Sequence, residues 1–139
     1  MEIAKGVHHF DCGAFNWYLI EESGRLTLVD AGFPGHYKVY KEGLKTLGKT
    51  SKDLEAIVLT HGHGDHTGFA ERLRKETGVP VFVHKNDAEM VKKPLQLPWF
   101  GLFINAWRPN TFVNVLGHAI VNGVFTLPHL TKVNSVEHG

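Results

Sequence analysis

The sequence has little cysteine, little net charge and no long apolar run, and each absence removes a class of protein. Its one cysteine, Cys12, cannot form an intramolecular disulfide, so nothing requires an oxidising compartment. The 15 Lys and Arg residues and 14 Asp and Glu residues leave a net charge of +1, which gives no electrostatic reason to expect nucleic acid or an anionic membrane as a partner. The N-terminus has no apolar core of the kind that a secretory signal needs. We therefore expect a cytoplasmic protein with no nucleic-acid or membrane partner.

The most apolar stretch, residues 95–121, is rich in aromatic side chains but is too interrupted to cross a membrane. Pro98, Arg108 and Pro109 break it, together with several asparagines, well before the roughly 20 apolar residues that a spanning helix requires. It is either an apolar flap that lines a substrate pocket or a helical cover packed on the sheet. The sequence leaves these two interpretations open.

The 139 residues have the length of one domain, in which strand patterns alternate with helix patterns. Short β-branched or aromatic runs bounded by turn residues predict strands at 7–10, 15–20, 26–29, 54–59 and 79–83. Apolar residues at helical spacing predict helices at 37–47 and 67–76. Asn86 or Asp87 is placed to begin a third helix, which Pro94 ends. This order predicts an α/β fold with helices covering a sheet.

The densest group of chemically active residues lies directly after the predicted strand 54–59. Three imidazoles and a carboxylate fall within six positions, with glycines between them: His61, His63, Asp65 and His66. Imidazole and carboxylate together are the ligand set of zinc, or of manganese or iron in a harder site. A loop that is merely rich in histidine is the alternative, which the glycine spacing disfavours. The group therefore predicts a metal site at a strand-to-helix junction, where sheet-based folds place their chemistry.

The spacing also suggests how these residues divide their tasks. His61 and His63 are two apart on a loop and can converge on one ion, while Asp65 and His66 can face a second. A water bridging two such ions loses a proton near neutral pH and becomes a nucleophile. Asp65 is the candidate catalytic residue, because a carboxylate beside that water can hold it or move its proton. The glycines at 62 and 64 are expected to adopt positive φ, and Gly68 to let the following helix pack closely.

The run 60–68, Thr-His-Gly-His-Gly-Asp-His-Thr-Gly, resembles the HxHxDH signature of the metallo-β-lactamase superfamily, and residues 16–20, 28–32 and 79–84 resemble the strands around it. The resemblance implies a four-layer αββα sandwich with two metal ions, zinc by preference and iron or manganese as alternatives. It implies hydrolysis of an ester, thioester, lactone, amide or phosphodiester by a metal-bound hydroxide. His61 and His63 would bind the first ion, Asp65 and His66 the second, and Asp30 would orient them from beneath.

The sequence also departs from the family pattern. We find no Pro-Gly-His-Thr segment, which carries the third histidine in family members, and no later aspartate and histidine ligands. Residues 1–139 are therefore expected to form a single truncated domain, the N-terminal half of the sandwich. Two ligands per ion, where catalytic zinc normally has three, predict weak metal binding. The inner sheet face, without its partner sheet, predicts a homodimer through that face, a cover formed by residues 95–121, or aggregation, and we favour partial covering together with self-association.

Two hypotheses of different classes follow for the function. The first is a metal-dependent hydrolase of small-molecule esters, thioesters or lactones; a nuclease of this family is disfavoured because no basic patch accompanies the motif. The second is a catalytically inactive truncated fragment that acts, if at all, as an interaction module by pairing with another chain. Metal content per chain and turnover of a generic ester would separate them.

Overall fold

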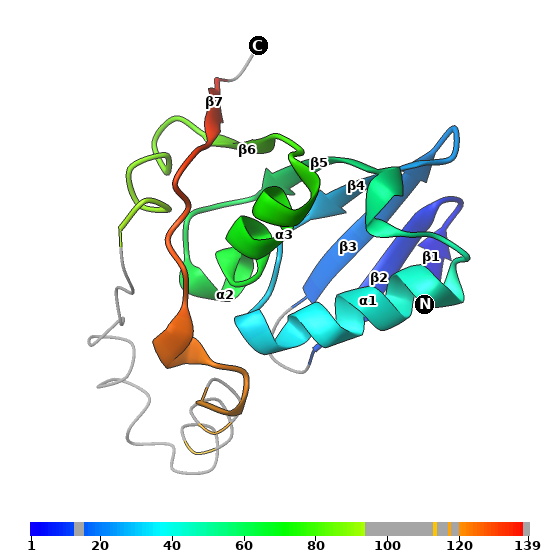
Figure 1. Ribbon diagram of the computed structural model, residues 1–139, viewed down its shortest axis with the longest axis horizontal. Helices are drawn as coiled ribbons and strands as arrows, with labels where there is room; N and C mark the ends of the chain where they lie inside the picture. Colours follow the sequence, from blue (N-terminus) through cyan, green and yellow to red (C-terminus); the bar gives the residue numbers. More distant parts are fainter. Residues whose placement is uncertain (13–15, 94–112, 114–116, 118–119, 138–139) are drawn as a thin grey trace.

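The computed structural model describes residues 1–12, 16–93, 113, 117 and 120–137. Its strands form one seven-stranded sheet in sequence order (Figure 1): β1 Glu2–Ala4, β2 Val7–Asp11, β3 Asn16–Glu22, β4 Arg25–Val29, β5 Leu54–Leu59, β6 Val81–His84 and β7 Asn134–Val136. The pairs β1 to β4 are antiparallel, and the pairs β4–β5, β5–β6 and β6–β7 are parallel. The sheet is therefore mixed, as expected for this α/β fold.

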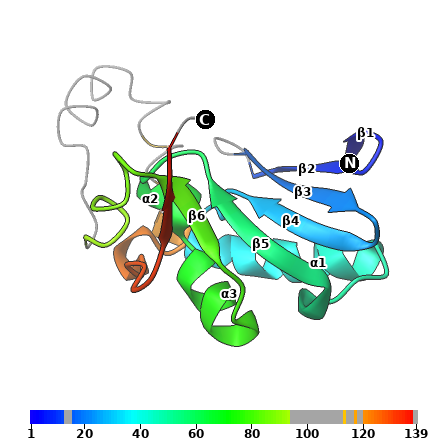
Figure 2. The ribbon, with the colours of Figure 1, turned by 90° about the horizontal axis from the view of Figure 1, so that it is seen from above.

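One face of the sheet carries the core, and the helices α1 (Tyr37–Thr46) and α3 (Ala70–Thr77) lie on that side (Figure 2). The strands alternate as a half-buried strand must: in β3, Trp17 and Leu19 are fully buried while Ile20 is 38% exposed. Tyr40 of α1 and Leu73 of α3 are fully buried against this face. Burial of these side chains on one face is what holds the helices to the sheet.

The opposite face of the sheet is less covered. The strand register aligns Tyr18, Val29, Val58 and Phe82 in one row across β3 to β6 on that face. Val58 remains 37% exposed, and Val136 of β7 43%. In the part of the chain that the structure describes, no helix packs on this face (Figure 2).

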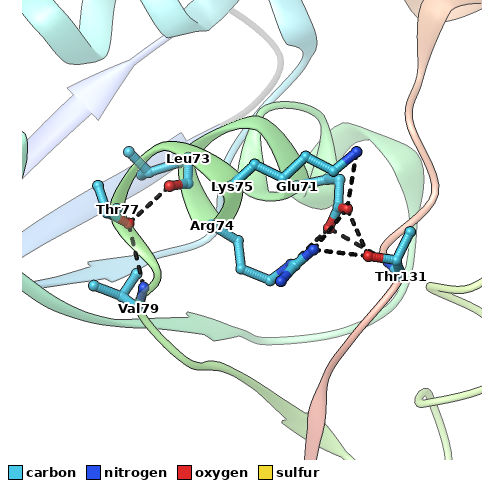
Figure 3. A network of polar contacts seen from close by, with 7 residues as sticks. All are labelled: Glu71, Leu73, Arg74, Lys75, Thr77, Val79 and Thr131. Carbon is cyan, nitrogen blue, oxygen red and sulfur yellow. Dashed lines mark hydrogen bonds and ion pairs between the residues drawn. The ribbon is translucent and has the colours of Figure 1, made fainter.

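Near the C-terminus, a segment returns to the sheet through a polar network that Figure 3 shows. The carboxylate of Glu71 on α3 accepts hydrogen bonds from Arg74 at 2.8 and 2.9 Å and from the Thr131 hydroxyl at 2.7 Å. Arg74 also donates to the Thr131 hydroxyl at 2.7 Å, and the Lys75 ammonium lies 3.4 Å from Glu71. This network fixes the chain three residues before β7, which then pairs with β6.

The prediction of a helix that begins at Asn86 or Asp87 is wrong. Residues 85–93 form a series of turns, with the Met90 N–H donating to the Asp87 carbonyl at 2.9 Å. The predicted helix 67–76 is divided into α2 (Gly64–Thr67) and α3, and the strand predicted at 79–83 begins at Val81. The sequence patterns missed β1 and β7. Most of residues 95–121 lie outside the described residues, and none of the described helices is long and apolar enough to span a membrane.

Candidate metal centre

The sheet topology brings Asp30 to the motif, although 36 positions separate it from His66. The strands β4 and β5 are parallel neighbours with Val29 beside Val58, so the segments that follow both strands leave the sheet at the same edge. The Asp30 N–H donates to the Val58 carbonyl at 2.9 Å, which ties the two strand ends together. The motif loop and the residue after β4 therefore meet at the carboxyl edge of the parallel strands, where such sheets carry their sites.

Asp30 is the structural centre of the site. It is 4% exposed and adopts a φ of 60°, a left-handed conformation that costs energy in a residue other than glycine. Its carboxylate accepts hydrogen bonds from the Thr60 N–H at 2.9 Å, the Thr60 hydroxyl at 2.8 Å and His66 Nδ1 at 2.8 Å. One buried carboxylate thus joins the start of the motif loop to its end.

The motif side chains lie close together at the end of β5. The ring centroid of His61 is 4.0 Å from that of His66 and 4.7 Å from that of His63. The Asp65 carboxylate lies 3.4 Å from His66 Nε2. No three His, Cys, Asp or Glu side chains among the described residues are arranged to hold a single ion. The described residues therefore offer at most two ligands to each ion.

The hydrogen bonds select the nitrogen that each ring presents. Because the Thr60 hydroxyl donates its proton to Asp30, its contact of 3.0 Å with His61 Nδ1 requires that nitrogen to be the donor. His61 Nε2 then carries the lone pair of the neutral ring. His66 Nδ1 donates to Asp30 in the same way. Metal-binding histidines typically donate their second ring nitrogen to a carboxylate or another oxygen, so His61 and His66 match metal ligands in kind.

Three titratable groups of the motif have shifted pKa values: that of His66 is raised, and those of His61 and Asp65 are lowered. Burial lowers the pKa of His66, but hydrogen bonds to Asp30 and Asp65 outweigh it and raise the pKa to about 9. Burial, together with the nearby charges of His66 and His63, lowers the pKa of His61. Burial raises the pKa of Asp65, but the hydrogen bond and charge of His66 outweigh it, so that the net shift is downward. Without metal, His66 is therefore a cation at neutral pH and must release a proton to become a ligand.

The structure adds three contacts to the motif loop that the sequence did not indicate. The Gly62 N–H donates to the Asp87 carboxylate at 3.3 Å, whereas the sequence pattern predicts Asp87 only as a helix cap. The side chains of Met90 and Leu127 lie against Gly62 and Gly64. No local pattern could have found these contacts, because they come from segments 25 or more positions away whose role depends on the fold.

The expectation of positive φ at Gly62 and Gly64 is wrong, since neither is among the positive-φ glycines of the chain. Both allow a close approach instead, because a Cβ at Gly62 would lie 3.0 Å from Met90 Cβ and one at Gly64 would lie 2.6 Å from Leu127 Cδ1. For Gly68 the expectation of close packing is confirmed. A Cβ there would lie 2.2 Å from the Gly32 carbonyl oxygen and 2.4 Å from Phe33 Cα.

Known proteins resemble this chain in sequence and in structure. A model of the metallo-beta-lactamase superfamily matches residues 11–138. The probable metallo-hydrolase YflN of Bacillus subtilis (strain 168) is 37% identical over 93 residues, which are 65% of this chain and 35% of that protein. Ribonuclease J of Mycobacterium tuberculosis (strain CDC 1551 / Oshkosh) is 37% identical over 75 residues, 48% of this chain and 13% of that protein.

Solved structures give the same result. BJP-1, a subclass B3 metallo-beta-lactamase of Bradyrhizobium japonicum, superimposes with a TM-score of 0.56 at 28% identity, covering 63% of this chain and 33% of that one. This chain spans about a third of the length of both BJP-1 and YflN. Its relatives include metallo-hydrolases and ribonucleases, so the comparisons support hydrolysis without selecting the bond. Because the family match covers nearly all of its length and the seven-stranded sheet matches the family fold, this chain belongs to the metallo-β-lactamase superfamily.

Proposed function

We propose that the protein is a metal-dependent hydrolase of small-molecule esters, thioesters or lactones. The observation that carries the proposal is the arrangement of His61, His63, Asp65 and His66 at the end of β5, with His66 held by the buried carboxylate of Asp30. Zinc is the preferred ion for three imidazoles and a carboxylate, with iron or manganese as alternatives. A divalent ion in such a site lowers the pKa of a water molecule and polarises a carbonyl oxygen.

The protein's own groups would perform the remaining tasks. His61, with its lone pair on Nε2, and His63 would hold one ion, and Asp65 with His66 would hold the second. Asp30 would keep His66 in one tautomer and orientation through the bond of 2.8 Å to Nδ1. Asp65, kept ionised at neutral pH by its lowered pKa, would accept a hydrogen bond from the attacking water and orient it.

The choice of bond rests on charge. Nucleases need a basic surface that follows the phosphate backbone, and the +1 net charge of this chain is spread over mixed signs. We therefore propose the ester, thioester or lactone bond of a small molecule as the substrate, and not the phosphodiester bond that the similarity to ribonuclease J would suggest. An RNA substrate cleaved faster than any ester would overturn this choice.

A second candidate function follows from the exposed sheet face. The chain spans about a third of YflN, and Ile20, Val58 and Val136 on this face are 38%, 37% and 43% exposed. A non-catalytic chain that pairs with a second copy through this face would bury that surface. Such a chain would self-associate but show no metal-dependent turnover.

The test combines metal content with turnover. The purified chain is loaded with zinc, and hydrolysis of p-nitrophenyl acetate, an acyl thioester and a lactone is measured before and after chelation. His61→Ala and Asp65→Asn should reduce turnover by at least 100-fold, since they remove a ligand and the water-orienting carboxylate. The matched control is His129→Ala, because His129 is exposed and outside the motif. Turnover that survives chelation or the His61 variant would refute the proposal.

A further inference from the structure

We infer that Met90 and Leu127 are positioning residues that hold the metal-binding loop from two sides. The inference rests on the proposed metal site and explains why the ligands alternate with glycine. Neither Gly62 nor Gly64 has a positive φ, so backbone freedom does not account for them. Their lack of a side chain makes room for two side chains from elsewhere in the chain.

Met90 and Leu127 lie so close to Gly62 and Gly64 that a residue with a side chain at either glycine would be crowded. A Cβ at Gly62 would lie 3.0 Å from Met90 Cβ and 3.2 Å from both Met90 Cγ and Sδ. A Cβ at Gly64 would lie 2.6 Å from Leu127 Cδ1. Since packed carbon atoms are most stable about 3.5–4.0 Å apart, Met90 and Leu127 occupy the space that side chains would need. They contact the loop on either side of His63.

Met90 is held in place by the turns of residues 85–93. Its N–H donates to the Asp87 carbonyl at 2.9 Å, and the Asp87 carboxylate accepts the Gly62 N–H at 3.3 Å. The Asp87 residue thus touches the motif loop directly and also anchors the turn that carries Met90. Val91, the next residue, is buried in the main core. The backbone of Met90 is therefore held in place, and its side chain contacts the loop from that position.

Leu127 is held by a different segment that is anchored at both ends. It follows η3 (Val124–Thr126), and it packs with Phe33 and Val124 in a small apolar cluster. Before η3, the Asn122 carbonyl accepts the Gly35 N–H at 3.0 Å. After Leu127, the Leu130 N–H donates to the Val91 carbonyl at 2.9 Å.

The two supports are therefore connected to each other as well as to the loop. The bond from Leu130 to Val91 joins the segment of Leu127 to the turns of Met90, and Thr131 is bound by Glu71 of α3 (Figure 3). A binding site gains affinity when its ligands are held near the bound geometry before the ligand arrives. Removing either side chain should let the loop leave that geometry without removing any ligand atom.

The experiment uses the full chain and cobalt(II) as the probe, titrated by visible absorbance with zinc as competitor. Met90→Ala and Leu127→Ala should each weaken cobalt affinity by about tenfold, the lower end of the effect seen when groups that orient metal ligands are lost. Met90→Leu and Leu127→Met should restore it, because they refill the space. The control is Leu47→Ala, since Leu47 is a partly buried core residue at the end of α1, away from the motif.

A second measurement needs no metal. Amide hydrogen exchange in the metal-free chain should be faster at residues 60–66 in both alanine variants and unchanged there in Leu47→Ala. Faster exchange with weaker cobalt binding supports the inference. Unchanged exchange and affinity in the alanine variants would overturn it, as would an equal loss of affinity in Leu47→Ala, which would reveal general destabilisation. If the unmodified chain binds no cobalt while exchange still responds to the variants, the proposed function fails but the support of the loop by Met90 and Leu127 stands.

Discussion

Glu71→Gln is expected to destabilise the chain strongly, and the loss should depend on pH. Glu71 is 3% exposed and lies within a network of Arg74, Lys75 and Thr131 (Figure 3). Burial raises the pKa of its carboxyl group, but the hydrogen bonds from Arg74 and Thr131 outweigh this and lower the pKa from 4.5 to about 2. A difference of that size corresponds to about 3 kcal/mol in favour of the ionised carboxylate in the folded state.

The sign of the pH dependence follows from the direction of the shift. Because the pKa of Glu71 is lower in the folded chain than in the unfolded chain, its contribution is complete above about pH 5 and is lost as the pH falls toward 2. The difference in unfolding free energy between the natural chain and Glu71→Gln should be about 2–3 kcal/mol at pH 7. It should fall to half of that value at about pH 3.2, midway between the two pKa values, where the carboxyl group is mostly protonated in the unfolded chain but still mostly ionised in the folded chain.

The assay is urea unfolding followed by circular dichroism at pH 7, 5, 4 and 3.2. Glu55→Gln is the matched control, because Glu55 pairs with Arg25 at 3.8 Å and both side chains are about half exposed. Such a pair contributes less than about 1 kcal/mol, so this variant should match the natural chain at each pH. A loss below about 1 kcal/mol for Glu71→Gln at pH 7, or a loss that does not change with pH, would refute the reasoning.

Three further predictions concern the site and the exposed face. Gly68→Ala should lower the unfolding free energy by more than about 3 kcal/mol, because its Cβ would lie 2.2 Å from the Gly32 carbonyl oxygen. Gly48→Ala, at φ 66° with no atom within 4 Å, should lower it by about 1 kcal/mol, and equal losses of stability in thermal melts would contradict the packing argument. In the metal-free chain, Asp30→Asn should lower the pKa of His66 below about 9, and the stability that the Asp30–His66 pair contributes should be complete below pH 6.5, the ordinary pKa of histidine, and disappear as the pH rises through about 9. A histidine NMR titration that finds the same pKa in the variant would show that Asp30 does not stabilise the protonated ring of His66. Light scattering should give a mass near twice 15.5 kDa for the chain and 15.5 kDa for Val58→Lys, and a monomeric natural chain would exclude pairing through this face.

Some of the fold could be predicted from local patterns alone. A short apolar run bounded by turn residues predicted β3, and apolar residues at helical spacing predicted α1, because a buried strand or helix face must carry apolar side chains. The histidine motif predicted a group of side chains at the end of β5, and the structure places their rings close together there. The strands β1 and β7 were missed because their residues are all exposed, so that backbone pairing and not apolar patterning makes them strands.

The sequence by itself determined which chemically active residues gather in the motif, and the tertiary structure decided which other residues contact them. Three imidazoles and a carboxylate within six positions indicate metal ligands wherever the loop lies. That Asp30 orients His66, that Glu71 binds Thr131, and that Met90 and Leu127 fill the spaces beside the glycines could not be read from spacing. These partners are 28 to 63 positions apart, and the parallel pairing of β4, β5 and β6, with the return of the C-terminal segment to β6, brings them together. Local periodicity indicates which face of a helix or strand is buried, whereas contacts between distant segments depend on which strands lie next to each other in the sheet.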